Sequence, residues 1–509
     1  MNRNVRRKIA AEKRRIEHRL GTAVEINEGG PLFGASNIRF EIADKTRAIS
    51  HGGIGIVHRL VKKLGLTTRI DAVLHLLKMH KPYHESDHVL NIVYNTMCGG
   101  QTLDDIELRR NDRTFLDALG VRSLPDPTTA GDFCRRFYQP QIEGLLDAVN
   151  ETRLDVWRSQ PESFTAETAR IDADGTIVPT EGECKEGMDI SYNGIWGYHP
   201  LLVSFANTSE PLFIENRSGN RASHLGVAPL FDKAIVLCRR AGFKDILLRG
   251  DTAFSITHEF DRWTDDGVRF VFGYDARKQI TARADSEPEK MYRELEQRAE
   301  REILTAPRAR PENVVDRIVR ERGYKVVRTT GEQIVDFDWK PVACSKTYRV
   351  VALRKNLSIE RGKEPQREMF EDIRYFFYIT NDFALSSDDV IHEARHRCNQ
   401  ENLIEQLKND VRALRAPTNT LNSNWAYMVM ASIAWSLKAW LGLMLPVLER
   451  WKEKHLEERE RVLRMEFRTF VAAFINVPAQ IVTAARGITY RVLSWNRNLQ
   501  TFFRLVDAT

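Results

Sequence analysis

The sequence has few cysteines for its length, and their spacing excludes several classes of protein. Six cysteines are scattered among 509 residues and form no C-x-x-C pair. This distribution argues against zinc ribbons, redox motifs and disulfide frameworks. The basic N-terminus also lacks the apolar h-region of a signal peptide. We therefore expect a protein of the reducing cytoplasm.

Long hydrophobic runs are scarce as well, and only residues 425–448 need testing as a membrane span. This segment, WAYMVMASIAWSLKAWLGLMLPVL, contains Ser432, Ser436, Lys438 and a terminal Pro446, and a charged helical pattern follows it. A spanning helix needs about 20 predominantly apolar residues with few or no charges. The sequence therefore predicts a buried core helix here, and no membrane partner.

The chain shows no strong excess of one charge, since its formal net charge is +6. A basic total indicates a polyanionic partner only where the charge is clustered. Hydrophobic residues make up 42% of the chain and charged residues 29%, as in a soluble globular protein. Because 509 residues exceed the usual size of one hydrophobic core, we expect two or three domains, or one domain with a large insertion.

Basic charge does cluster in an N-terminal arm, residues 1–49. Among the first twenty residues only Glu12 and Glu17 are acidic. The basic residues there are Arg3, Arg6, Arg7, Lys8, Lys13, Arg14, Arg15 and Arg19. An arm of this composition is typical of segments that follow a phosphate backbone. The alternative is a solvated helix with no partner.

Helical periodicity runs through residues 50–165, which we interpret as a helical DNA-binding region. Near its end Thr129 and Asp132 have capping-box spacing, and the helix that they are predicted to start carries Arg135 and Arg136. A helical DNA-reading module has this pattern, but so has any small helical bundle.

The pattern changes at Ala169 to strands that alternate with helices, so the predicted fold class is α/β. Charged segments and short strand-like runs interrupt this core, and we interpret them as an insertion subdomain. The predicted boundaries are 166–280 for the first part of the core, 281–370 for the insertion, 371–445 for the second part and 446–509 for a helical C-terminal region.

Two predicted strands carry acidic side chains at positions suited to ligands. Asp172 and Asp174 share a face of the first strand, since successive side chains alternate. Asp251 follows the apolar run ILL of the fourth strand, at the carboxyl end where α/β sheets usually place ligands. A buried carboxylate is costly unless it is paired or holds a cation. Each aspartate taken singly is also typical of a turn or a helix cap.

The segment RCNQENLIEQLKND, residues 397–410, predicts a helix with a further acidic residue. Arg397, Glu401 and Lys408 lie at positions i, i+4 and i+11, along the edge of an apolar stripe. The stripe consists of Leu403, Ile404, Leu407 and Val411. One interpretation is an i,i+4 salt bridge on a half-exposed helix, worth roughly a few tenths of a kcal/mol. The other is that Glu401 converges with the aspartates on divalent cations.

Carboxylates from two strands and one helix suit hard cations. Mg²⁺, or Mn²⁺ in its place, prefers oxygen ligands and is usually held by one or two carboxylates plus substrate phosphates. Two such ions about 3.5–4 Å apart activate an attacking oxygen and stabilise the leaving one in a phosphoryl displacement. Asp174, Asp251 and Glu401 would suffice to hold two ions.

Several motifs together carry a resemblance to a known family: ARIDADGT, IENRSGNRASHLG followed by ILLRGDTAF, RYFFYITN, and RCNQENLIEQLK. With them the chain resembles bacterial insertion-sequence transposases of the DDE type, in the cut-and-paste branch whose closing helix carries a Tyr, Arg, Glu, Lys signature. Arg397, Glu401 and Lys408 match the spacing of that signature, whereas the tyrosine position is Ala394. The resemblance covers about residues 50–500 and implies an RNase H-like mixed-sheet core.

The resemblance also implies which acidic residues act. Asp174, Asp251 and Glu401 would form the catalytic, metal-binding triad. Asp174 is preferred over Asp172 because the family's first acid is followed at i+2 by a threonine, here Thr176.

DNA contacts are implied in the same way. Arg397 and Lys408 would touch DNA phosphates near the cleaved end. In related transposases an aromatic residue of the insertion stacks on a base flipped out beside the cleavage site, and Trp339 in DFDWKP is the candidate here. A core tryptophan in a small β subdomain is the alternative.

The implied function is cut-and-paste transposition. Metal-dependent hydrolysis at the ends of an insertion sequence would precede transesterification, in which a 3′-hydroxyl attacks target DNA. Many relatives cut the second strand through a hairpin. The partners would be double-stranded transposon ends and target DNA, bound by a homodimer in a synaptic complex at the nucleoid. The alternative is a catalytically inactive, transposase-derived DNA-binding protein.

One motif indicates a different class of enzyme. HEARH, residues 392–396, matches the H-E-x-x-H helix of zinc peptidases, which supplies two metal ligands and a general base. Arg395 inside the motif and Arg397 after it place cations where Zn²⁺ would bind, and no recognisable third-ligand motif follows. We therefore regard a zinc peptidase as the weaker hypothesis.

Overall fold

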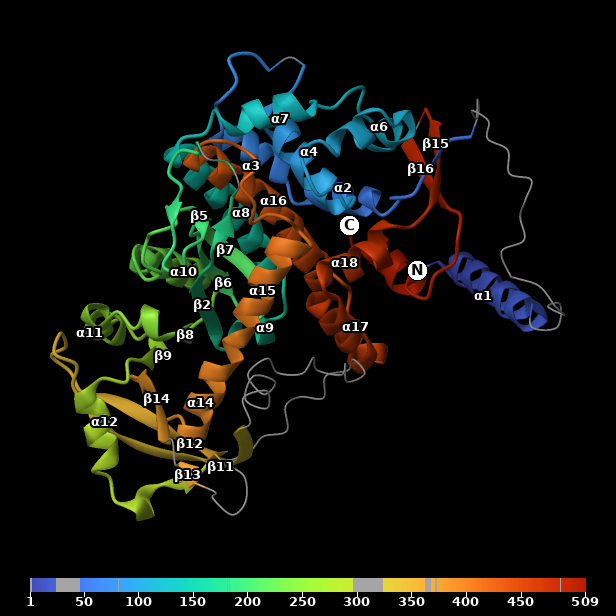
Figure 1. Cartoon of the computed structure of the whole chain (residues 1–509). Helices are drawn as coiled ribbons and strands as arrows, with labels where there is room; N and C mark the ends of the chain where they lie inside the picture. Colours follow the sequence, from blue (N-terminus) through green and yellow to red (C-terminus); the bar gives the residue numbers. More distant parts are fainter. Residues whose placement is uncertain are drawn as a thin grey trace.

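A computed structural model gives the arrangement of the chain (Figure 1). The structure describes residues 2–23, 46–80, 82–180, 182, 184–295, 324–361, 368–370, 373–485 and 487–509. Helices from both ends of the sequence gather on one side of a long twisted sheet, and the two termini lie close together. The sheet then continues away from these helices, which leaves its far strands on a projecting part of the molecule.

The segment after the arm is helical, as the periodicity predicts. Its helices are α2 (Ile54–Lys63), α3 (Leu66–Val73), α4 (Glu85–Met97), α5 (Ile106–Arg110), α6 (Arg113–Leu119), α7 (Pro127–Cys134), α8 (Gln139–Arg158) and α9 (Glu162–Ala166). The cap of α7 is Asp126, which accepts a hydrogen bond from the Thr129 backbone N–H at 2.8 Å. The predicted capping box of Thr129 and Asp132 is therefore wrong, because an aspartate followed by proline at the first helical position starts the helix earlier.

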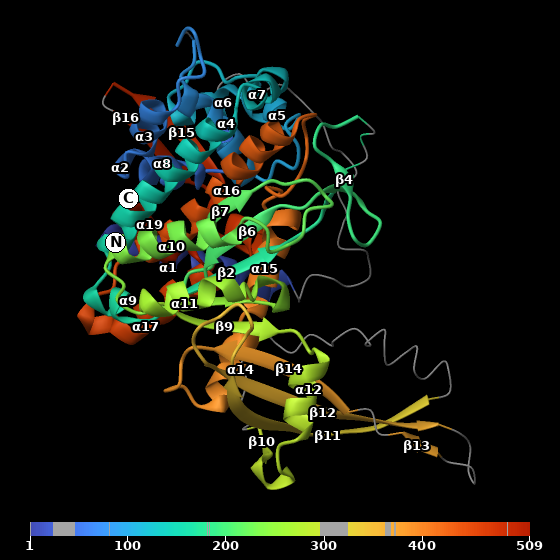
Figure 2. The same ribbon diagram turned by 90° about the vertical axis from the view of Figure 1, so that its left-hand side faces the viewer.

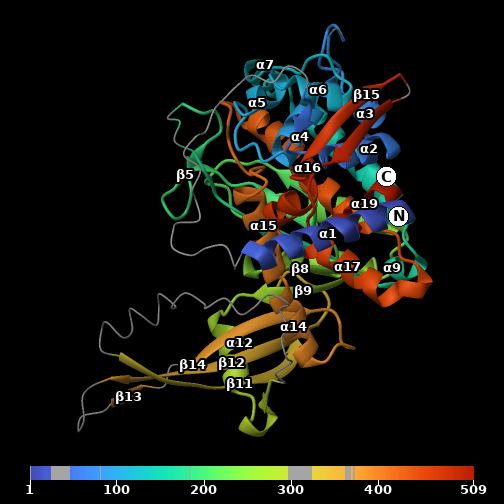
Figure 3. The same ribbon diagram turned by 90° about the vertical axis from the view of Figure 1, so that its right-hand side faces the viewer.

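The N-terminal arm begins as helix α1 (Arg3–Ala23), and residues 24–45 lie outside the described residues. Helix α1 contacts α19 (Leu499–Ala508) near the C-terminus, and Ile9 is its buried residue (Figure 3). The six arginines of this helix, Arg3, Arg6, Arg7, Arg14, Arg15 and Arg19, are exposed. The two ends of the chain therefore pack together, and the basic face of the arm stays open to solvent.

The core is a mixed sheet whose strand order is that of an RNase H-like fold, as predicted. Its central strands are β2 (Ala169–Gly175), β6 (Leu201–Phe205), β7 (Glu210–Glu215), β8 (Ile246–Gly250) and β9 (Arg269–Tyr274), in the order β7-β6-β2-β8-β9. Strand β2 pairs antiparallel with β6 and parallel with β8, and β8 pairs parallel with β9. Helices α10 (Val227–Ala241) and α11 (Thr257–Asp265) make the crossovers that parallel neighbours require.

Two turns connect these strands and helices. A turn at residues 206–209 joins β6 to β7, with Ser209 at a φ of 54°. Helix α10 ends at Gly242, whose φ of 109° lies in the region that only glycine adopts without strain.

The segment expected as an insertion leaves the core sheet and then extends it. Strand β14 (Ile373–Thr380) pairs directly with β9, so the chain between them departs and returns. That stretch includes α12 (Lys278–Asp285), β10 (Arg293–Glu294), β11 (Tyr324–Trp339), β12 (Tyr348–Arg361) and β13 (Glu368–Phe370). Strand β12 pairs with β14, and β11 pairs with β12, so one sheet runs through the core and the inserted strands (Figure 2).

The C-terminal part packs helices and one hairpin against the core. Its helices are α14 (Ser387–His396), α15 (Cys398–Asn409), α16 (Leu421–Leu443), α17 (Lys452–Arg464), α18 (Phe467–Phe470) and α19. Strands β15 (Ala479–Ala484) and β16 (Gly487–Val492) form a hairpin that pairs with β1 (Ala48–Ile49), a feature the sequence reasoning did not predict. Helix α16 is long and apolar enough to cross a membrane, yet its most apolar window is wholly buried, as a core helix is.

Candidate active site

Strand β2 presents two aspartates on one face, and the structure gives them different surroundings. Asp172 is buried and accepts two hydrogen bonds from Arg249, at 2.7 Å from Nε and 2.8 Å from Nη2. Arg249 is the last but one residue of the neighbouring strand β8, so its guanidinium lies directly across from Asp172. Asp174, two residues farther along β2, lines a pocket instead. Asp172 is therefore neutralised by the fold, and Asp174 is the aspartate open to a ligand.

A glutamate from α14 completes the buried ion-pair network around Arg249. Glu393 Oε2 accepts from Arg249 Nη1 at 2.9 Å, and the same carboxylate accepts from Arg170 Nε at 3.0 Å. Burial alone would raise the pKa of Glu393, but the hydrogen bonds and charges of Arg170 and Arg249 lower it. This network fixes α14 over the sheet and orients the helix that follows.

The same network argues against a zinc peptidase. Glu393 is the glutamate of the HEARH motif, and two arginines hold its carboxylate. A general base must be free to accept a proton from water, so Glu393 is unsuited to that role. Among the residues that the structure describes, no three His, Cys, Asp or Glu side chains form a ready-made metal site.

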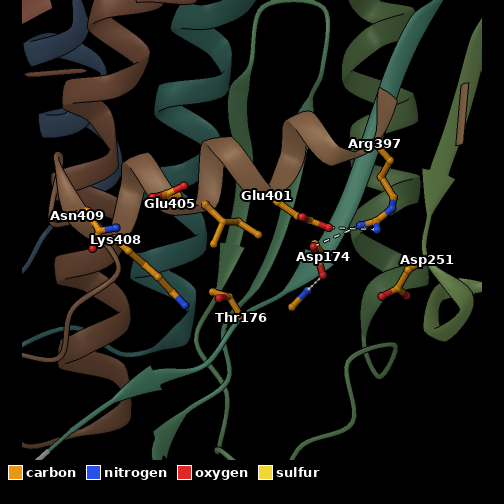
Figure 4. Close-up of a pocket in the computed structure, with 10 residues that line it drawn as sticks. Asp174, Thr176, Asp251, Arg397, Glu401, Glu405, Lys408 and Asn409 are labelled. Atoms are coloured by element: carbon orange, nitrogen blue, oxygen red, sulfur yellow. Dashed lines mark hydrogen bonds and ion pairs between the residues drawn. The ribbon is translucent and has the colours of Figure 1, made fainter. Parts of the chain in front are cut away.

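A pocket of about 480 Å³ opens at the carboxyl ends of β2 and β8, where α15 crosses the sheet. It is lined by Asp174, Gly175, Thr176, Asp251, Arg397, Glu401, Ile404, Glu405, Lys408 and Asn409 (Figure 4). The three predicted catalytic acids and both signature cations therefore line one pocket, although they come from segments far apart in the sequence.

Helix α15 reaches the pocket with one face because its other face is buried. The predicted stripe of Leu403, Ile404, Leu407 and Val411 lies in the core. Gln400 anchors the start of the helix by donating from Nε2 to the Leu202 carbonyl of β6 at 3.3 Å. Residues one helical turn apart then project from the edge of the stripe into the pocket, which explains their spacing of three or four.

Arg397 lies at the junction of α14 and α15 and bridges two of the acids. Its Nη1 is 3.4 Å from Asp174 Oδ2, and its Nη2 is 3.4 Å from Glu401 Oε1. The Arg397 side chain is only 16% exposed, whereas that of Glu401 is 60% exposed. In Figure 4 dashed lines join this guanidinium group to the side chains of Asp174 and Glu401. A cation shared by Asp174 and Glu401 would therefore have to displace Arg397.

The pKa of Asp174 reflects the burial and the charges of the groups around the pocket. Burial raises its pKa, Arg397 opposes that rise, and the negative charges of Asp251 and Glu401 add to it, with a result of about 6. Because the charges of Asp251 and Glu401 both raise the pKa of Asp174, the three carboxylates are close enough to repel one another. A bound cation would relieve this repulsion, which is the arrangement expected of a carboxylate metal site.

Asp251 serves as a helix cap and also lines the pocket. Its Oδ1 accepts a hydrogen bond from the Ala253 backbone N–H at 2.8 Å, at the start of a short 3-10 helix. The cap fixes the side chain at the end of β8 and uses one lone pair of the carboxylate. The remaining lone pairs of the carboxylate can face a cation, so the capping interpretation and the ligand interpretation are compatible.

Lys408 and Thr176 close the other end of the pocket. Burial and the neighbouring Arg415 lower the pKa of Lys408, while the charge of Asp174 raises it. In Figure 4 the Lys408 side chain extends from the end of α15 toward Thr176. An amine partly removed from water beside the triad is placed to pair with an anionic group such as a phosphate.

The donor set fits hard divalent cations. Asp174, Asp251 and Glu401 offer only carboxylate oxygens, which Mg²⁺ and Mn²⁺ prefer. The pocket is open enough for a substrate phosphate to supply further oxygen ligands.

The other residues predicted to contact DNA lie outside this pocket. Arg135 donates to Asp132 and, at 3.2 Å, to Asn419 Oδ1, and Arg136 donates to the Leu76 carbonyl at 3.4 Å. Trp339, at the end of β11, is partly buried and packs against the hydrophobic core. Its indole nitrogen is buried without a hydrogen-bond partner in the described part of the chain. The role of Trp339 on a flipped base stays a prediction.

Sequence reasoning missed pocket residues that the helical spacing could have found. Glu405 and Asn409 line the pocket and follow Glu401 at intervals of four residues, so they belong to the same face of α15. Gly175 was also missed. A Cβ at this position would lie 2.7 Å from His199 Nε2, so only glycine lets the imidazole ring pack against the strand behind Asp174.

Comparison with known proteins identifies a family that matches most of the chain. The sequence model described as "Transposase DDE domain group 1" matches residues 34–507. No curated protein sequence matches the chain. Among solved structures, the chain is similar to a piggyBac transposase in a synaptic complex with hairpin DNA, with 9% identity and a TM-score of 0.35 over 84% of this chain and 82% of that one.

Proposed function

Because the chain belongs to the DDE transposase family whose domain spans residues 34–507, we propose that it cuts DNA at the ends of its own mobile element and joins them to target DNA. The supporting observation is the meeting of Asp174, Asp251 and Glu401 in one pocket. Their placement on β2, after β8 and on α15 is the one that the sequence predicted for a catalytic triad.

The proposed reaction has two phosphoryl-transfer steps. In the first, a water oxygen attacks the phosphorus at the element end, the P–O3′ bond breaks, and a 3′-hydroxyl is released. In the second, that 3′-oxygen attacks a target phosphodiester, so one P–O bond forms as another breaks. DDE transposases use divalent metals, and two ions would supply charge stabilisation for the attacking and leaving oxygens.

The residues of the chain have separate tasks in this proposal. Asp174, Asp251 and Glu401 would hold the cations with carboxylate oxygens. Lys408 pairs with a phosphate of the cleaved end, because its amine reaches into the pocket beside the triad. Arg397 balances the charges of Asp174 and Glu401 in this structure, and its guanidinium group would pair with the DNA backbone once cations took its place.

The setting of the reaction is part of the same proposal. Two element ends must be cut and joined together, so we expect a homodimer that binds two double-stranded ends and the target. The resemblance to bacterial insertion-sequence transposases supports a bacterial element and suggests a hairpin route for the second strand, and a DNA substrate would place the protein at the nucleoid. The exposed arginines of α1 support an electrostatic contact with the DNA flanking the ends.

A cleavage assay tests the proposal directly. Purified protein is incubated with DNA that carries both ends of its element, in Mg²⁺, in Mn²⁺ or in EDTA, and products are separated on denaturing gels. We expect metal-dependent nicks that leave 3′-hydroxyls, and joined products when target DNA is added. Specific end binding without cleavage in either metal would refute catalysis and favour the second candidate, a DNA-binding protein of transposase descent.

A further inference from the structure

The two ends of the active-site pocket carry opposite charges. Asp174, Asp251 and Glu401 line the end from which α15 begins, and Lys408 lines the other end, seven residues after Glu401 (Figure 4). Seven residues of an α-helix span about 10 Å along its axis. Divalent cations would occupy the acidic end, so the basic end requires a ligand of the opposite charge.

A second cation, Arg415, lies beside Lys408 at the basic end. Arg415 belongs to the connection between α15 and α16, and its Nε donates a hydrogen bond to the Lys408 carbonyl at 3.2 Å. Burial and then the charge of Arg415 lower the pKa of Lys408, so the two cations are close enough to repel each other. Within the described residues, neither side chain forms an ion pair with a carboxylate. A bound anion would relieve this repulsion.

A strained turn brings Arg415 back to the end of α15. Arg412 has a φ of 56°, in the left-handed region that residues other than glycine rarely adopt. After this turn the Leu414 backbone N–H donates to the Leu407 carbonyl at 3.1 Å, so the chain folds back on the last turn of the helix. The hydroxyl of the buried Tyr427 donates to the Arg412 carbonyl at 3.2 Å and holds the turn. Strained backbone persists only where its surroundings hold it, and it clusters at ligand sites.

The hydrogen bond to the helix end also orients the guanidinium group of Arg415. Its Nε is occupied by the Lys408 carbonyl, and the C-terminal end of a helix favours a nearby cation. Its two Nη groups have no hydrogen-bond partner in the part of the chain that the structure describes, and the residue is partly exposed. A planar guanidinium with available N–H groups fits two oxygens of one phosphate. Arg415 is therefore oriented for an anion before the anion arrives.

We propose that Arg415 and Lys408 together bind one backbone phosphate of the element-end strand, beside the phosphodiester that the pocket cuts. The ligand must carry negative charge on its oxygens, because both side chains offer only N–H donors. A backbone phosphate meets this requirement, and its binding fixes the position of the strand relative to the three acids. This inference rests on the proposed function and adds to it Arg415, which lies outside the signature of the closing helix.

The test neutralises single phosphates of the DNA. In a duplex that carries an already cut element end, each phosphate beside the cleavage site is replaced, one at a time, by an uncharged methylphosphonate. Binding is measured in EDTA, so the result depends on neither metal nor cleavage. We expect one such replacement to weaken binding of the wild type roughly 10- to 100-fold, as the loss of a hydrogen bond between charged groups does.

The variant Arg415→Gln removes the charge and keeps an N–H donor for the Lys408 carbonyl. The cost of the critical methylphosphonate should be at least about fivefold smaller in this variant than in the wild type, because both changes remove the same contact. The slope of DNA affinity against salt should fall by about one phosphate contact. Arg415→Lys keeps the charge without the planar group and should recover part of the affinity. Thermal melts of both variants establish that they are folded.

The matched control is Arg468→Gln, which removes the same charge near the same turn. Arg468 is paired with Asp410 at 3.2 Å, its side chain is 79% exposed, and it lies outside the pocket lining. This variant should show the same dependence on the critical methylphosphonate as the wild type. If both variants weaken binding equally at every linkage, Arg415 acts only through its general charge and the inference fails.

Three further results would overturn the inference. The critical methylphosphonate could cost the wild type and Arg415→Gln the same affinity. Arg415→Gln could bind the end like the wild type and melt at a lower temperature, which would make Arg415 only a helix cap. In a parallel series with methylphosphonates in target DNA, the coupling to Arg415 could appear there and not in the element end. If the wild type binds the end but cuts it with neither metal, the proposed function fails by itself, and the methylphosphonate series still decides whether Arg415 binds a phosphate.

Discussion

The substitution Glu401→Gln separates the two interpretations of the signature helix. The Glu401 side chain is 60% exposed, and its Oε1 forms an ion pair with Nη2 of Arg397, 3.4 Å away and one helical turn earlier. An exposed i,i+4 pair of this kind stabilises a helix by about 0.3–0.5 kcal/mol. The glutamine variant should therefore lose less than about 0.5 kcal/mol of unfolding free energy, which lowers the melting temperature by no more than about 2 °C.

The effect on activity should be far larger than the effect on stability. If Glu401 holds a cation, the substitution replaces a charged oxygen ligand by a neutral amide in the pocket. Removing one preorganised electrostatic contact from an active site costs about 100- to 1,000-fold in rate, or about 2.7–4 kcal/mol of transition-state stabilisation. We therefore expect cleavage of the element ends to fall at least about 100-fold while end binding persists.

The assay measures single-turnover cleavage in Mg²⁺, binding of the same DNA without metal, and unfolding by heat. Glu405→Gln is the matched control, because Glu405 also lines the pocket on α15 and its substitution removes the same charge one turn farther along. That variant should cut within about threefold of the wild type, since a charge outside the triad contributes only through screened electrostatics. Cleavage by Glu401→Gln within about threefold of the wild type would refute the catalytic interpretation and leave a surface salt bridge.

Four further predictions follow from the geometry. The folded pKa of Asp174, about 6, lies above its unfolded value, so this group favours folding at low pH and that contribution is lost as pH rises from about 4 to 6. In urea titrations without metal, the unfolding free energy of Asp174→Asn should exceed that of the wild type by about 1–3 kcal/mol at pH 7.5 and should equal it at pH 4. The same difference at both pH values would contradict the raised pKa of Asp174. Asp172→Asn removes one of the two carboxylates that pair with the buried Arg249, the other being Glu393, and should cost about 3–5 kcal/mol in the same titrations. A loss below about 1 kcal/mol would contradict the buried ion pair. Deleting residues 2–23 should weaken binding to any DNA and reduce the dependence of DNA affinity on salt concentration. An unchanged dependence on salt would indicate that the arm is a solvated helix without a DNA contact. Lys408→Ala should weaken binding of the cleaved end while Mg²⁺ still raises the melting temperature, and equal DNA affinity would remove its phosphate contact.

Much of the fold could be predicted because its signals are local. The alternation of ARIDADG, the apolar run before Asp251 and the stripe on residues 403–411 each follow from the period of one strand or one helix. The strand order was expected only through the resemblance to an RNase H-like core, since connection lengths indicate which strands can be parallel but not their order. The β15–β16 hairpin escaped prediction, because its partner β1 is a two-residue strand more than four hundred residues earlier.

The sequence also identified the candidate acids, Asp174, Asp251 and Glu401, and the resemblance to a known family assigned them to one site. Spacing along one helix placed Arg397, Glu401 and Lys408 on one face, because that relation depends only on 3.6 residues per turn. The sequence could not supply their relation to the aspartates, which lie on other elements.

The resemblance favoured Asp174 over Asp172 through Thr176, but only the tertiary structure gave the physical reason for the difference. Alternation puts both on the same face of β2, so no local rule separates them. The difference comes from Arg249, which is 77 residues away in the sequence and directly opposite Asp172 in the folded sheet. Tertiary contacts also placed Arg397 between Asp174 and Glu401. The physical reason is that a local period determines which way a side chain points, whereas its charge state and its partners depend on groups that only the packed fold brings near.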